Sequence, residues 1–486
     1  MAEARRRAEL VPEGGCRSAG HLNCRSAGSA RNPPFLRLPS RPLGHKGLRR
    51  LRAVALRHCT RYSRCPTQTA VKFAILTQYY PPEVGAPQSR LSALARAFVR
   101  RGHQVTVLTA MPNYPTGRIH KGYGGCFRQE VRDGVRVQRT FIWPTQKTDV
   151  PRRLASYGSF VLSAALAGSL RLDAPDYLLV ESPPLFLGLA GVLLSRLKRA
   201  RLIFNVSDLW PESAVRLGLV RQGSAAHRLS AALEHFCYRN AWLVTGQSME
   251  IVNDIAARFP DCKTLHLSNG VDTQAFGPDT STPAASHVLG KNGTCIALYA
   301  GLHGLAQGLE LLVAAAASLP SSANLEMILM GDGPTKASVV DRVRAQQIPR
   351  VRFLGSRPHG DMPAILATAD VLLVPLLRYI PGAVPSKLYE AMASGRPVIL
   401  IGEGEAARIV REHDAGIVVA PGDLGGLVQA LRILSSDADL RGRLGANGRA
   451  AAVQFFERSR VAATLIELLE RSLHRPSGLV PAFELR

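Results

Sequence analysis

The sequence predicts an α/β protein made of two doubly wound parallel sheets that face a common cleft. From residue 71, short apolar runs alternate with amphipathic helical segments, and this alternation pauses near residue 265 and restarts near 295. Strands that are apolar throughout are covered on both faces, which is typical of parallel sheets with right-handed helical crossovers. A chain of 486 residues is also long enough for two domains of ordinary size.

The first predicted strand is KFAILTQ at 72–78. The helix expected after it, at 88–103, repeats apolar residues at the 3.6-residue period and so presents one apolar face. That face consists of Leu91, Leu94, Ala95, Phe98 and Val99. Five more strands are expected, with helices between most of them: QVTVLTA, VRVQRTF, DYLLVES, RLIFNVSD and AWLVTGQ.

A linker is predicted at 265–287, where LHLSNGVDTQAFGPDTSTPAASH is polar and rich in Pro, Ser and Thr. Beyond it, six apolar runs each precede a helical segment: CIALYAG, LEMILMGDG, VRFLGS, DVLLVPL, PVILIG and GIVVAP. We therefore expect a first domain at 71–275 and a second at 276–455. A C-terminal helix and tail at 456–486 are expected to pack back on the first domain.

Residues 1–70 differ from the rest of the chain. They hold 15 of the 61 Lys and Arg residues but only 3 of the 36 Asp and Glu, and they repeat the pentapeptide CRSAG. The four cysteines Cys16, Cys24, Cys59 and Cys65 form no C-x-x-C pair, so no zinc site is predicted. We interpret the segment as disordered or as a wrongly assigned gene start, with translation beginning at Val71; a targeting peptide is the alternative.

The later cysteines, Cys126, Cys237, Cys262 and Cys295, are scattered. That pattern favours reduced, mostly buried thiols in a cytoplasmic protein.

No apolar run reaches the 18 residues that a membrane-spanning helix needs. Two shorter apolar stretches, 156–170 and 184–201, are accompanied by basic residues that include Arg152, Arg153 and Arg171. They are either helices that cover a sheet or helices that lie on an anionic membrane surface.

Two loops of the first domain contain candidate functional residues. QYYPPEVGAPQSR contains Gly85, which lets a ligand approach the backbone, and Arg90, which faces either the cleft or solvent. NVSDLWPES follows a strand, and its Asp208 and Glu212 would share a helical face at i, i+4. Such carboxylates can orient a hydroxyl or stabilise positive charge at a sugar carbon. The alternative is that Asp208 caps a helix opened by proline.

Two loops of the second domain are rich in glycine. YAGLHGLAQGLE supplies Gly301, His303 and Gly304 between a strand and a helix, and a helix N-terminus there suits a diphosphate. MGDGP supplies Gly331 and Gly333, where a base or ribose can approach the backbone. A loop histidine with a structural role is the competing interpretation of His303.

The segment PSKLYEAMASGRP begins a further helix at Pro385 or Ser386, again after a strand. Glu390 lies one turn into that helix and can accept hydrogen bonds from two ribose hydroxyls, while Lys387 can meet a phosphate. The alternative is an ordinary surface pair worth a few tenths of a kcal/mol. The carboxyl ends of parallel strands are where open α/β folds bind ligands, which favours the functional interpretation.

Taken in order, these motifs resemble the retaining nucleotide-sugar glycosyltransferases of family 4, which have the GT-B fold. The resemblance covers about residues 71–470 and rests on GAPQSR, SDLWPES, SNGVDTQAF, YAGLHGLAQGLE, MGDGP and PSKLYEAMASGRPVI. The wording of DLWPES and PSKLYE looks like the bacterial branch that builds O-antigen, capsule and exopolysaccharide, including N-acetylfucosaminyl transferases.

The resemblance implies transfer, with retention, from a nucleotide sugar (a UDP sugar is expected) to a saccharide or lipid-linked acceptor. It implies no metal and no cofactor, because protein cations and helix ends stabilise the leaving diphosphate. It also implies a cytoplasmic enzyme that works at the inner face of the plasma membrane.

The chain departs from the family pattern at several positions. Glu390 matches the second glutamate of the family's E-x7-E motif, but Gly382 stands where the first, which contacts the transferred sugar, is usual. Leu302 and Gln307 stand where the family commonly has basic residues for the diphosphate.

The cations that remain for the diphosphate are His303, Lys387 and Arg378, and Arg90 is a further phosphate or acceptor candidate. Asp208 lies where many relatives carry a histidine near the reacting sugar.

Three other functions fit parts of the sequence. A GT-B sugar-nucleotide epimerase resembling the UDP-N-acetylglucosamine 2-epimerases would consume donor without an acceptor. A non-catalytic scaffold that binds nucleotide sugars would account for the missing glutamate and cations. Nucleic-acid binding would use the formal charge of +25, but no nucleic-acid-binding motif appears and we expect no nucleic-acid partner.

Overall fold

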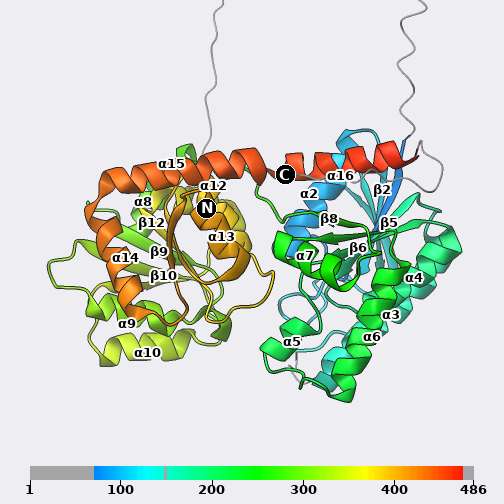
Figure 1. The fold of residues 1–486 in the computed structure, drawn as a ribbon, viewed down its shortest axis with the longest axis horizontal. Helices are drawn as coiled ribbons and strands as arrows, with labels where there is room; N and C mark the ends of the chain where they lie inside the picture. Colours follow the sequence, from blue (N-terminus) through cyan, green and yellow to red (C-terminus); the bar gives the residue numbers. More distant parts are fainter. Residues whose placement is uncertain (1–69, 147–149, 474–486) are drawn as a thin grey trace, which may run out of the picture. The chain divides into compact units, whose positions relative to one another are not determined.

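The computed structural model of the chain describes residues 70–146 and 150–473. The predictions for 1–69, including its four cysteines, and for the tail 474–486 fall outside the described residues. The α/β architecture is as expected, with an eight-stranded sheet followed along the chain by a six-stranded sheet (Figure 1). We call the first sheet with its helices the first half and the second sheet with its helices the second half.

The first sheet has the strand order β3-β4-β2-β1-β5-β6-β7-β8. Neighbouring strands are parallel except for the pair β3 and β4. The strands are β1 Lys72–Leu76, β2 Gln104–Ala110, β3 Phe127–Arg132, β4 Val135–Thr140, β5 Tyr177–Ser182, β6 Arg201–Val206, β7 Leu243–Gly246 and β8 Thr264–His266.

The expectation of a purely parallel first sheet is wrong at this edge. β3 has the polar sequence FRQEVR, pairs antiparallel with β4 and has no buried residue. A strand with one partner and no covered face needs no apolar run, so the search for apolar strands did not find it.

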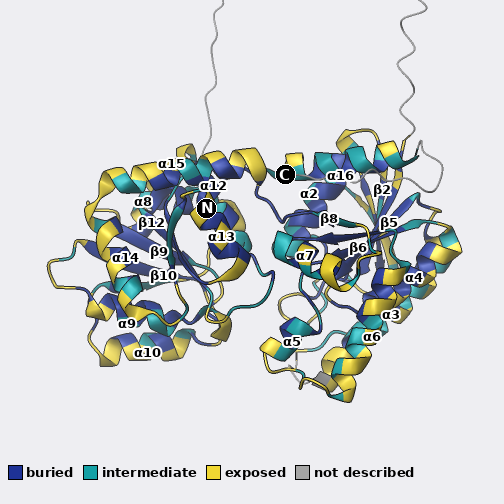
Figure 2. Cartoon of the chain, viewed as in Figure 1, coloured by how far each residue is buried: buried dark blue, intermediate teal, exposed yellow. Residues whose placement is uncertain are grey.

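Helices cover both faces of the first sheet. Alternate residues of β1 point to opposite faces, so that Phe73 and Ile75 join the core under α2 and α16 while Ala74 and Leu76 join the core under α3 and α4. The central strands of both sheets are the most buried part of each half (Figure 2). The helices of this half are α2 Ala86–Arg100, α3 Val150–Arg171, α4 Leu187–Lys198, α5 Glu212–Arg216, α6 Ala225–Asn240, α7 Met249–Arg258 and α16 Arg458–Leu473.

The expected amphipathic face of α2 is confirmed for Leu91, Leu94, Ala95 and Phe98, which are buried, whereas Val99 is half-buried. The last helix, α16, contacts α2 and contributes Leu465 to the core below it.

The second sheet has the strand order β11-β10-β9-β12-β13-β14, and all of its pairs are parallel. Its strands are β9 Cys295–Ala300, β10 Leu325–Met330, β11 Val351–Leu354, β12 Val371–Pro375, β13 Val398–Ile401 and β14 Gly416–Val419. Its helices are α8 Pro283–Leu289, α9 Leu309–Ser318, α10 Lys336–Ala345, α11 Met362–Thr368, α12 Ser386–Ala393, α13 Gly404–Glu412, α14 Leu424–Ser436 and α15 Ala438–Phe455. Helix α8 begins inside the segment that the sequence predicted as a linker, and Thr282 caps it.

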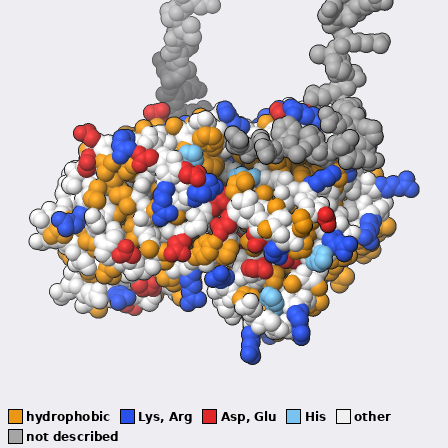
Figure 3. Space-filling view, in the orientation of Figure 1, with side chains coloured by type: hydrophobic (Ala, Val, Ile, Leu, Met, Phe, Trp, Pro, Cys, Tyr) orange, Lys and Arg blue, Asp and Glu red, His pale blue; other side chains and the backbone are white. Residues whose placement is uncertain are grey.

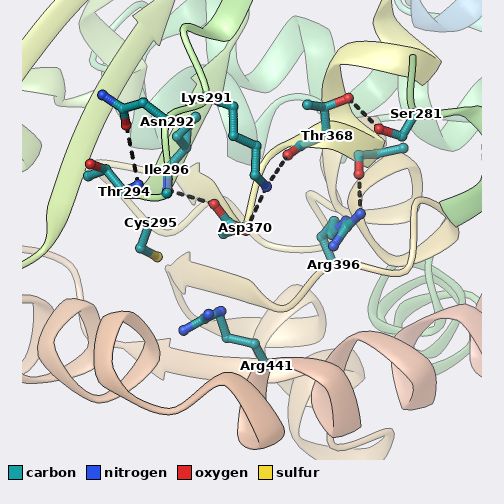
Figure 4. Close-up of polar contacts among 12 residues, drawn as sticks. Ser281, Lys291, Asn292, Thr294, Cys295, Ile296, Thr368, Asp370, Arg396 and Arg441 are labelled. Atoms are coloured by element: carbon teal, nitrogen blue, oxygen red, sulfur yellow. Dashed lines mark hydrogen bonds and ion pairs between the residues drawn. The ribbon is translucent and has the colours of Figure 1, made fainter. Parts of the chain in front are cut away.

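Polar contacts close the amino ends of two central strands of this sheet (Figure 4). Asp370, just before β12, accepts hydrogen bonds from the backbone N–H of Ile296 and from Lys291, each at 2.9 Å. Lys291 also donates to the carbonyl of Thr368 at 2.9 Å. These contacts occupy one end of the sheet, so a ligand would bind at the carboxyl ends, as is usual in such folds.

Of the four cysteines in the described part, Cys237 and Cys295 are buried, Cys262 is half-buried and Cys126 is exposed, and all four are free thiols. None of the helices in the described segments is both long enough and apolar enough to cross a bilayer.

Candidate functional site

A buried polar network lies at the carboxyl ends of β5, β6 and β7. The guanidinium of Arg90 makes an ion pair with Glu181 and hydrogen bonds to Ser207 at 3.1 Å and Gln247 at 3.3 Å. Glu181 also accepts hydrogen bonds from Asn205 at 2.8 Å and from Ser207 at 2.6 Å. We call these five residues the Arg90 network. Arg90 is thus turned inward, so its solvent-facing alternative is wrong.

Strand register explains why these side chains meet. Glu181 on β5 is directly beside Asn205 on β6, and Asn205 is beside Thr245 on β7. Thr245 donates to the Asn205 side chain at 2.7 Å, which continues the network along the sheet edge. Adjacent strands are about 4.8 Å apart, so residues in register are within hydrogen-bonding reach.

Asp208 lies just beyond the end of β6, next to the Arg90 network. Burial raises the pKa of Asp208 to about 6, with the negative charge of Glu181 acting in the same direction and the positive charge of Arg90 opposing it. A carboxyl group with a pKa near the working pH is suited to exchanging a proton with a substrate hydroxyl.

The sequence placed Asp208 and Glu212 on one helical face, or made Asp208 a helix cap, and both expectations are wrong. α5 begins only at Glu212, and its N-cap is Pro211 without a side-chain cap. Glu212 has a buried oxygen that finds no partner among the described residues, and its charge helps to raise the pKa of Glu234.

Gly85 is the N-cap of α2 in an extended conformation. A Cβ there would approach the Gln88 side chain at 2.5 Å, so the glycine makes room for that side chain.

In the second half, the loops after β9 and β10 touch backbone to backbone. Gly331 has φ +140 and Gly333 has φ +154, and a Cβ on either would overlap with the carbonyl group of Gly301 or His303. Only glycine allows this approach. The 3-10 helix Leu305–Gln307 follows Gly304, and the helix expected in this segment, α9, begins at Leu309.

His303 is completely buried between these loops. Burial lowers its pKa, and the nearby Lys336 lowers it further. Neither ring nitrogen has a hydrogen-bond partner among the described residues. The lowered pKa favours a neutral imidazole, which argues against His303 as a cation for a diphosphate.

Helix α12 begins at Ser386 with Pro385 as its N-cap, as expected. The ammonium group of Lys387 lies 4.9 Å from the centre of the Tyr299 ring and donates to the Tyr299 hydroxyl at 3.2 Å. A Cβ on Gly301 would overlap with that ammonium group, which places Lys387 against the loop after β9. Burial lowers the pKa of Lys387, and Glu390 opposes the shift.

Burial raises the pKa of Glu390 to about 7, against the opposing charges of Arg458 and Lys387. Arg458 opens α16, far along the chain from α12, and it hydrogen bonds to the carbonyl of Asn269 at 3.3 Å. Sequence reasoning missed Arg458 because no local pattern links it to Glu390. It also missed Lys336, which donates to the carbonyl of Gly331 at 2.8 Å.

Arg378, the remaining candidate cation, is exposed in the loop after β12.

Gly382 cannot accept a larger side chain in this conformation. Its φ of +75 is in the left-handed region, and a Cβ would overlap with Ile251 and lie 3.1 Å from the Ser248 hydroxyl. Both of those residues belong to the start of α7 in the first half. Position 382, where the family's glutamate is missing, therefore has no room for a glutamate side chain in this conformation.

The same part of α7 exchanges hydrogen bonds with α13. The carboxylate of Glu405 accepts from the backbone N–H groups of Met249 at 2.8 Å and Glu250 at 2.5 Å. Glu250 in turn accepts from the backbone N–H of Glu405 at 3.2 Å and from the Tyr379 hydroxyl. Each helix N-terminus therefore receives a carboxylate from the other helix, a favourable arrangement for the helix dipole.

Within 70–146 and 150–473, no group of three or more His, Cys, Asp and Glu side chains is arranged to hold a metal ion. The arrangement combines a carboxyl group of raised pKa at the carboxyl ends of the first sheet with a lysine, a glutamate and glycine-loop backbone at the carboxyl ends of the second sheet. Such groups can hold a polyol and an anionic phosphate group and assist a transfer between hydroxyl groups.

Comparisons with known families relate the chain to glycosyltransferases. Residues 85–270 match the family described as glycosyl transferase 4-like domain, and residues 284–451 match glycosyl transferases group 1. A putative colanic acid biosynthesis glycosyl transferase, WcaI of Escherichia coli strain K12, is 25% identical over 341 residues, covering 67% of this chain and 81% of the relative. A probable glycosyltransferase, WbjE of Pseudomonas aeruginosa, is 26% identical over 272 residues, covering 55% of this chain and 67% of the relative.

Solved structures share the fold. Sucrose-phosphate synthase from Thermosynechococcus elongatus superposes with a TM-score of 0.65 at 20% identity, covering 82% of this chain and 98% of that one. The Anabaena protein HepE, solved in complex with UDP-glucose, gives a TM-score of 0.60 at 18% identity, covering 82% of this chain and 100% of that one.

Proposed function

Since this chain belongs to the group 1, family 4-like glycosyltransferases of the GT-B fold, which retain the anomeric configuration and use nucleotide-sugar donors, we propose that it transfers a sugar from a UDP donor to a lipid-linked saccharide. The product would enter bacterial surface polysaccharide. The relative named for colanic acid biosynthesis and the HepE complex with UDP-glucose support the pathway and the donor.

The observation that carries the proposal is the start of α12. Glu390 and Lys387 lie one turn apart there, and Lys387 reaches the loop after β9 beside Gly301. In the proposed complex, the Glu390 carboxylate accepts hydrogen bonds from the donor ribose. Lys387 and the glycine-loop backbone face the diphosphate and stabilise its charge as it leaves, without a metal or another cofactor.

In the proposed reaction, the bond between the anomeric carbon and the diphosphate oxygen breaks, and UDP leaves with the bonding electron pair. The acceptor oxygen then bonds to the same face of that carbon. Asp208, whose pKa of about 6 leaves it mostly ionised at neutral pH, orients the acceptor hydroxyl and takes up its proton. Two members of the Arg90 network act on this carboxyl group in opposite directions: Glu181 raises the pKa of Asp208, and Arg90 lowers it.

The proposed place of action is the inner surface of the bacterial plasma membrane. Helices α3 and α4 contact one another, and each exposes leucines at a spacing of four residues. These are Leu162, Leu166 and Leu170 on α3 and Leu189, Leu193 and Leu197 on α4, with exposed fractions from 45% to 74%. We call these six residues the leucine face.

Charge supports a lipid surface as the partner of the leucine face. Neither α3 nor α4 contains an acidic residue, and both have basic residues near their ends, among them Arg152, Arg153, Arg171, Arg196 and Lys198. An apolar stripe with basic ends is suited to the headgroup region of an anionic bilayer.

The face of the molecule drawn in Figure 3 gives no support for a nucleic-acid partner. Lys and Arg side chains lie at separate places over the face shown in Figure 3 rather than in one stripe.

The test is an assay of the purified chain with several UDP sugars and a panel of polyprenyl-diphosphate-linked saccharides. We expect transfer from one UDP sugar, with product and donor of the same anomeric configuration by NMR. Conversion of a UDP sugar in the absence of any acceptor to its epimer would instead support an epimerase. UDP binding without turnover on any acceptor would favour a scaffold, and absence of UDP binding would overturn the proposal.

A further inference from the structure

A polar pocket that is lined by none of the site residues discussed above lies at the carboxyl ends of β1 and β2. It has a volume of about 230 Å³ and opens between the turn after β1, the loop after β2 and the first turns of α3. We call it the tyrosine pocket. The lining residues that matter are Gln78, Tyr79, Asn113, Tyr114, Arg153 and Tyr157.

Gln78 brings an unpaired acceptor to the tyrosine pocket. Its side chain is 3% exposed, and its amide nitrogen donates to the Tyr79 hydroxyl at 3.1 Å. Its amide oxygen, however, has no partner among the described residues. A buried amide oxygen without a partner is unfavourable, and a small shift of the side chain that opens it to the tyrosine pocket would let a ligand hydroxyl donate to it.

The walls of the tyrosine pocket are held in place by one buried carboxylate. Glu83 accepts hydrogen bonds from the backbone N–H groups of Tyr80 at 3.2 Å, Asn113 at 2.8 Å and Tyr114 at 2.8 Å. It therefore ties the turn after β1 to the loop after β2. The rings of Tyr79 and Tyr114 meet edge to face, with centroids 5.7 Å apart. Walls fixed before a ligand arrives lower the entropic cost of binding it.

The third wall brings positive charge. Arg153 is exposed and lines the tyrosine pocket from the first turn of α3, which also contains Arg152 and no acidic residue. An anionic group in the tyrosine pocket would pair with this guanidinium, the side chain best shaped for phosphate.

We propose that the tyrosine pocket binds the acceptor, with its terminal sugar against Tyr79, Tyr114 and the Gln78 amide and its phosphate beside Arg153. This inference rests on the function proposed above and names the residues that recognise the acceptor. The flat apolar face of a pyranose ring fits an aromatic wall, and its hydroxyls fit the unpaired amide.

The position of the tyrosine pocket agrees with this role. In the sheet order, β1 is separated from β6 only by β5, so the strand that leads to Asp208 is about 10 Å from the strand that leads to Gln78. In the proposed complex, the sugar extends from the tyrosine pocket past the end of β5, so that one of its hydroxyls faces Asp208. The wall at Arg153 belongs to α3, the helix whose outer side carries half of the leucine face, so a lipid attached to the phosphate would extend towards it.

The experiment measures binding by calorimetry with three probes: a short-chain prenyl-diphosphate N-acetylglucosamine, the same prenyl diphosphate without sugar, and UDP. Wild type should bind all three. Tyr114→Ala should weaken the sugar-bearing probe about tenfold and leave the bare prenyl diphosphate nearly unchanged. Arg153→Ala should weaken both prenyl probes about tenfold. UDP affinity should stay unchanged in both variants, which also shows that they are folded.

Arg228→Ala, an exposed arginine on α6, is the control and should change none of the affinities. The proposal is overturned if wild type binds UDP but neither prenyl probe at millimolar concentration, or if the pocket variants bind both as wild type does. Wild type that fails to bind UDP would instead contradict the proposed function itself.

Discussion

The guanidinium of Arg90 and the carboxylate of Glu181 form a buried ion pair, with only 7% and 3% of the two side chains exposed. The pair joins α2 to the end of β5, and both charges act on Asp208. Glu181 raises the pKa of Asp208 and Arg90 lowers it, in addition to the dominant effect of burial. Substitutions in this pair should therefore shift the protonation of Asp208 in opposite directions.

The first prediction concerns the acid limb of the transfer reaction. If ionised Asp208 is required, kcat/KM should fall below about pH 6 in the wild type. Glu181→Gln removes a negative neighbour and should move this limb to lower pH. Arg90→Met removes a positive neighbour and should move it to higher pH. Arg90→Met leaves Glu181 buried and unpaired and should also cost about 3–5 kcal/mol of stability.

Arg96→Ala is the matched control, since Arg96 is on the same helix but pairs with the exposed Asp133 at 3.5 Å. It should leave the pH profile unchanged. Acid limbs that coincide in wild type, Glu181→Gln and Arg90→Met would contradict the role of Asp208.

The second prediction concerns Glu390 and the donor ribose. Burial raises the pKa of Glu390 to about 7, so the carboxylate that accepts two ribose hydrogen bonds is present only above that pH. Uridine affinity should rise with pH and level off above about pH 7, and uridine avoids the titration of the phosphates in UDP. Arg458→Met removes a charge that lowers this pKa, so it should move the rise to higher pH.

Glu390→Ala should abolish donor binding, and Glu390→Gln should bind uridine weakly with no pH dependence. Calorimetry over a pH series checks all variants. UDP affinity in Glu390→Ala equal to that of wild type would refute the assignment of this residue.

Much of the fold could be predicted because buried parallel strands must be apolar, and such runs stand out in the sequence. The start of α12 was also predictable, since Pro385 and a polar pair after an apolar strand form a local pattern. The edge strand β3 has no such pattern. Glu181, Arg458 and the burial of His303 depend on strand register and on contacts between distant segments, which no local spacing reveals.

The third prediction separates the phosphate contact from the nucleoside contact. Lys387 is the lysine that reaches the loop beside Gly301, and a hydrogen bond to a charged group is worth about 1.5–3 kcal/mol. Lys387→Ala should therefore weaken UDP by about tenfold to a hundredfold and uridine very little. Arg411→Ala, an exposed basic residue on α13, should affect neither. Equal losses for UDP and uridine in Lys387→Ala would count against a phosphate contact.

The fourth prediction is that restoring the family's glutamate at Gly382 does not restore a sugar contact. In Gly382→Ala, the alanine would have to adopt the left-handed φ of +75, and its Cβ would overlap with the side chain of Ile251. The substitution should therefore lower the free energy of unfolding by about 1–3 kcal/mol. Gly382→Glu should cost at least as much, without tighter binding of UDP-glucose. Gly360→Ala, where no atom lies within 4 Å of the new Cβ, should be nearly neutral in denaturant unfolding. A stable Gly382→Glu variant with higher donor affinity would show that the loop adopts another conformation.

The fifth prediction concerns the leucine face and anionic lipid. Sedimentation with phosphatidylglycerol vesicles should show binding that weakens with salt. Burying a leucine in an apolar phase is worth about 1.5–3 kcal/mol, and the leucines replaced lie only at an interface. Leu162→Ser with Leu166→Ser should therefore reduce the partition coefficient by about tenfold or more. Substitution of Arg152 and Arg153 should reduce it about fivefold for each charge, since a basic residue near an anionic surface contributes about 1 kcal/mol.

Leu424→Ser, at a partly exposed leucine on α14 in the second half, is the control for the apolar contribution and should bind vesicles as wild type does. Neutral phosphatidylcholine vesicles separate the two contributions, because they retain the effect of the leucines and remove that of the arginines. Binding that ignores salt and both arginine substitutions would defeat the electrostatic contribution. Binding that ignores the double leucine variant would show that another surface meets the bilayer.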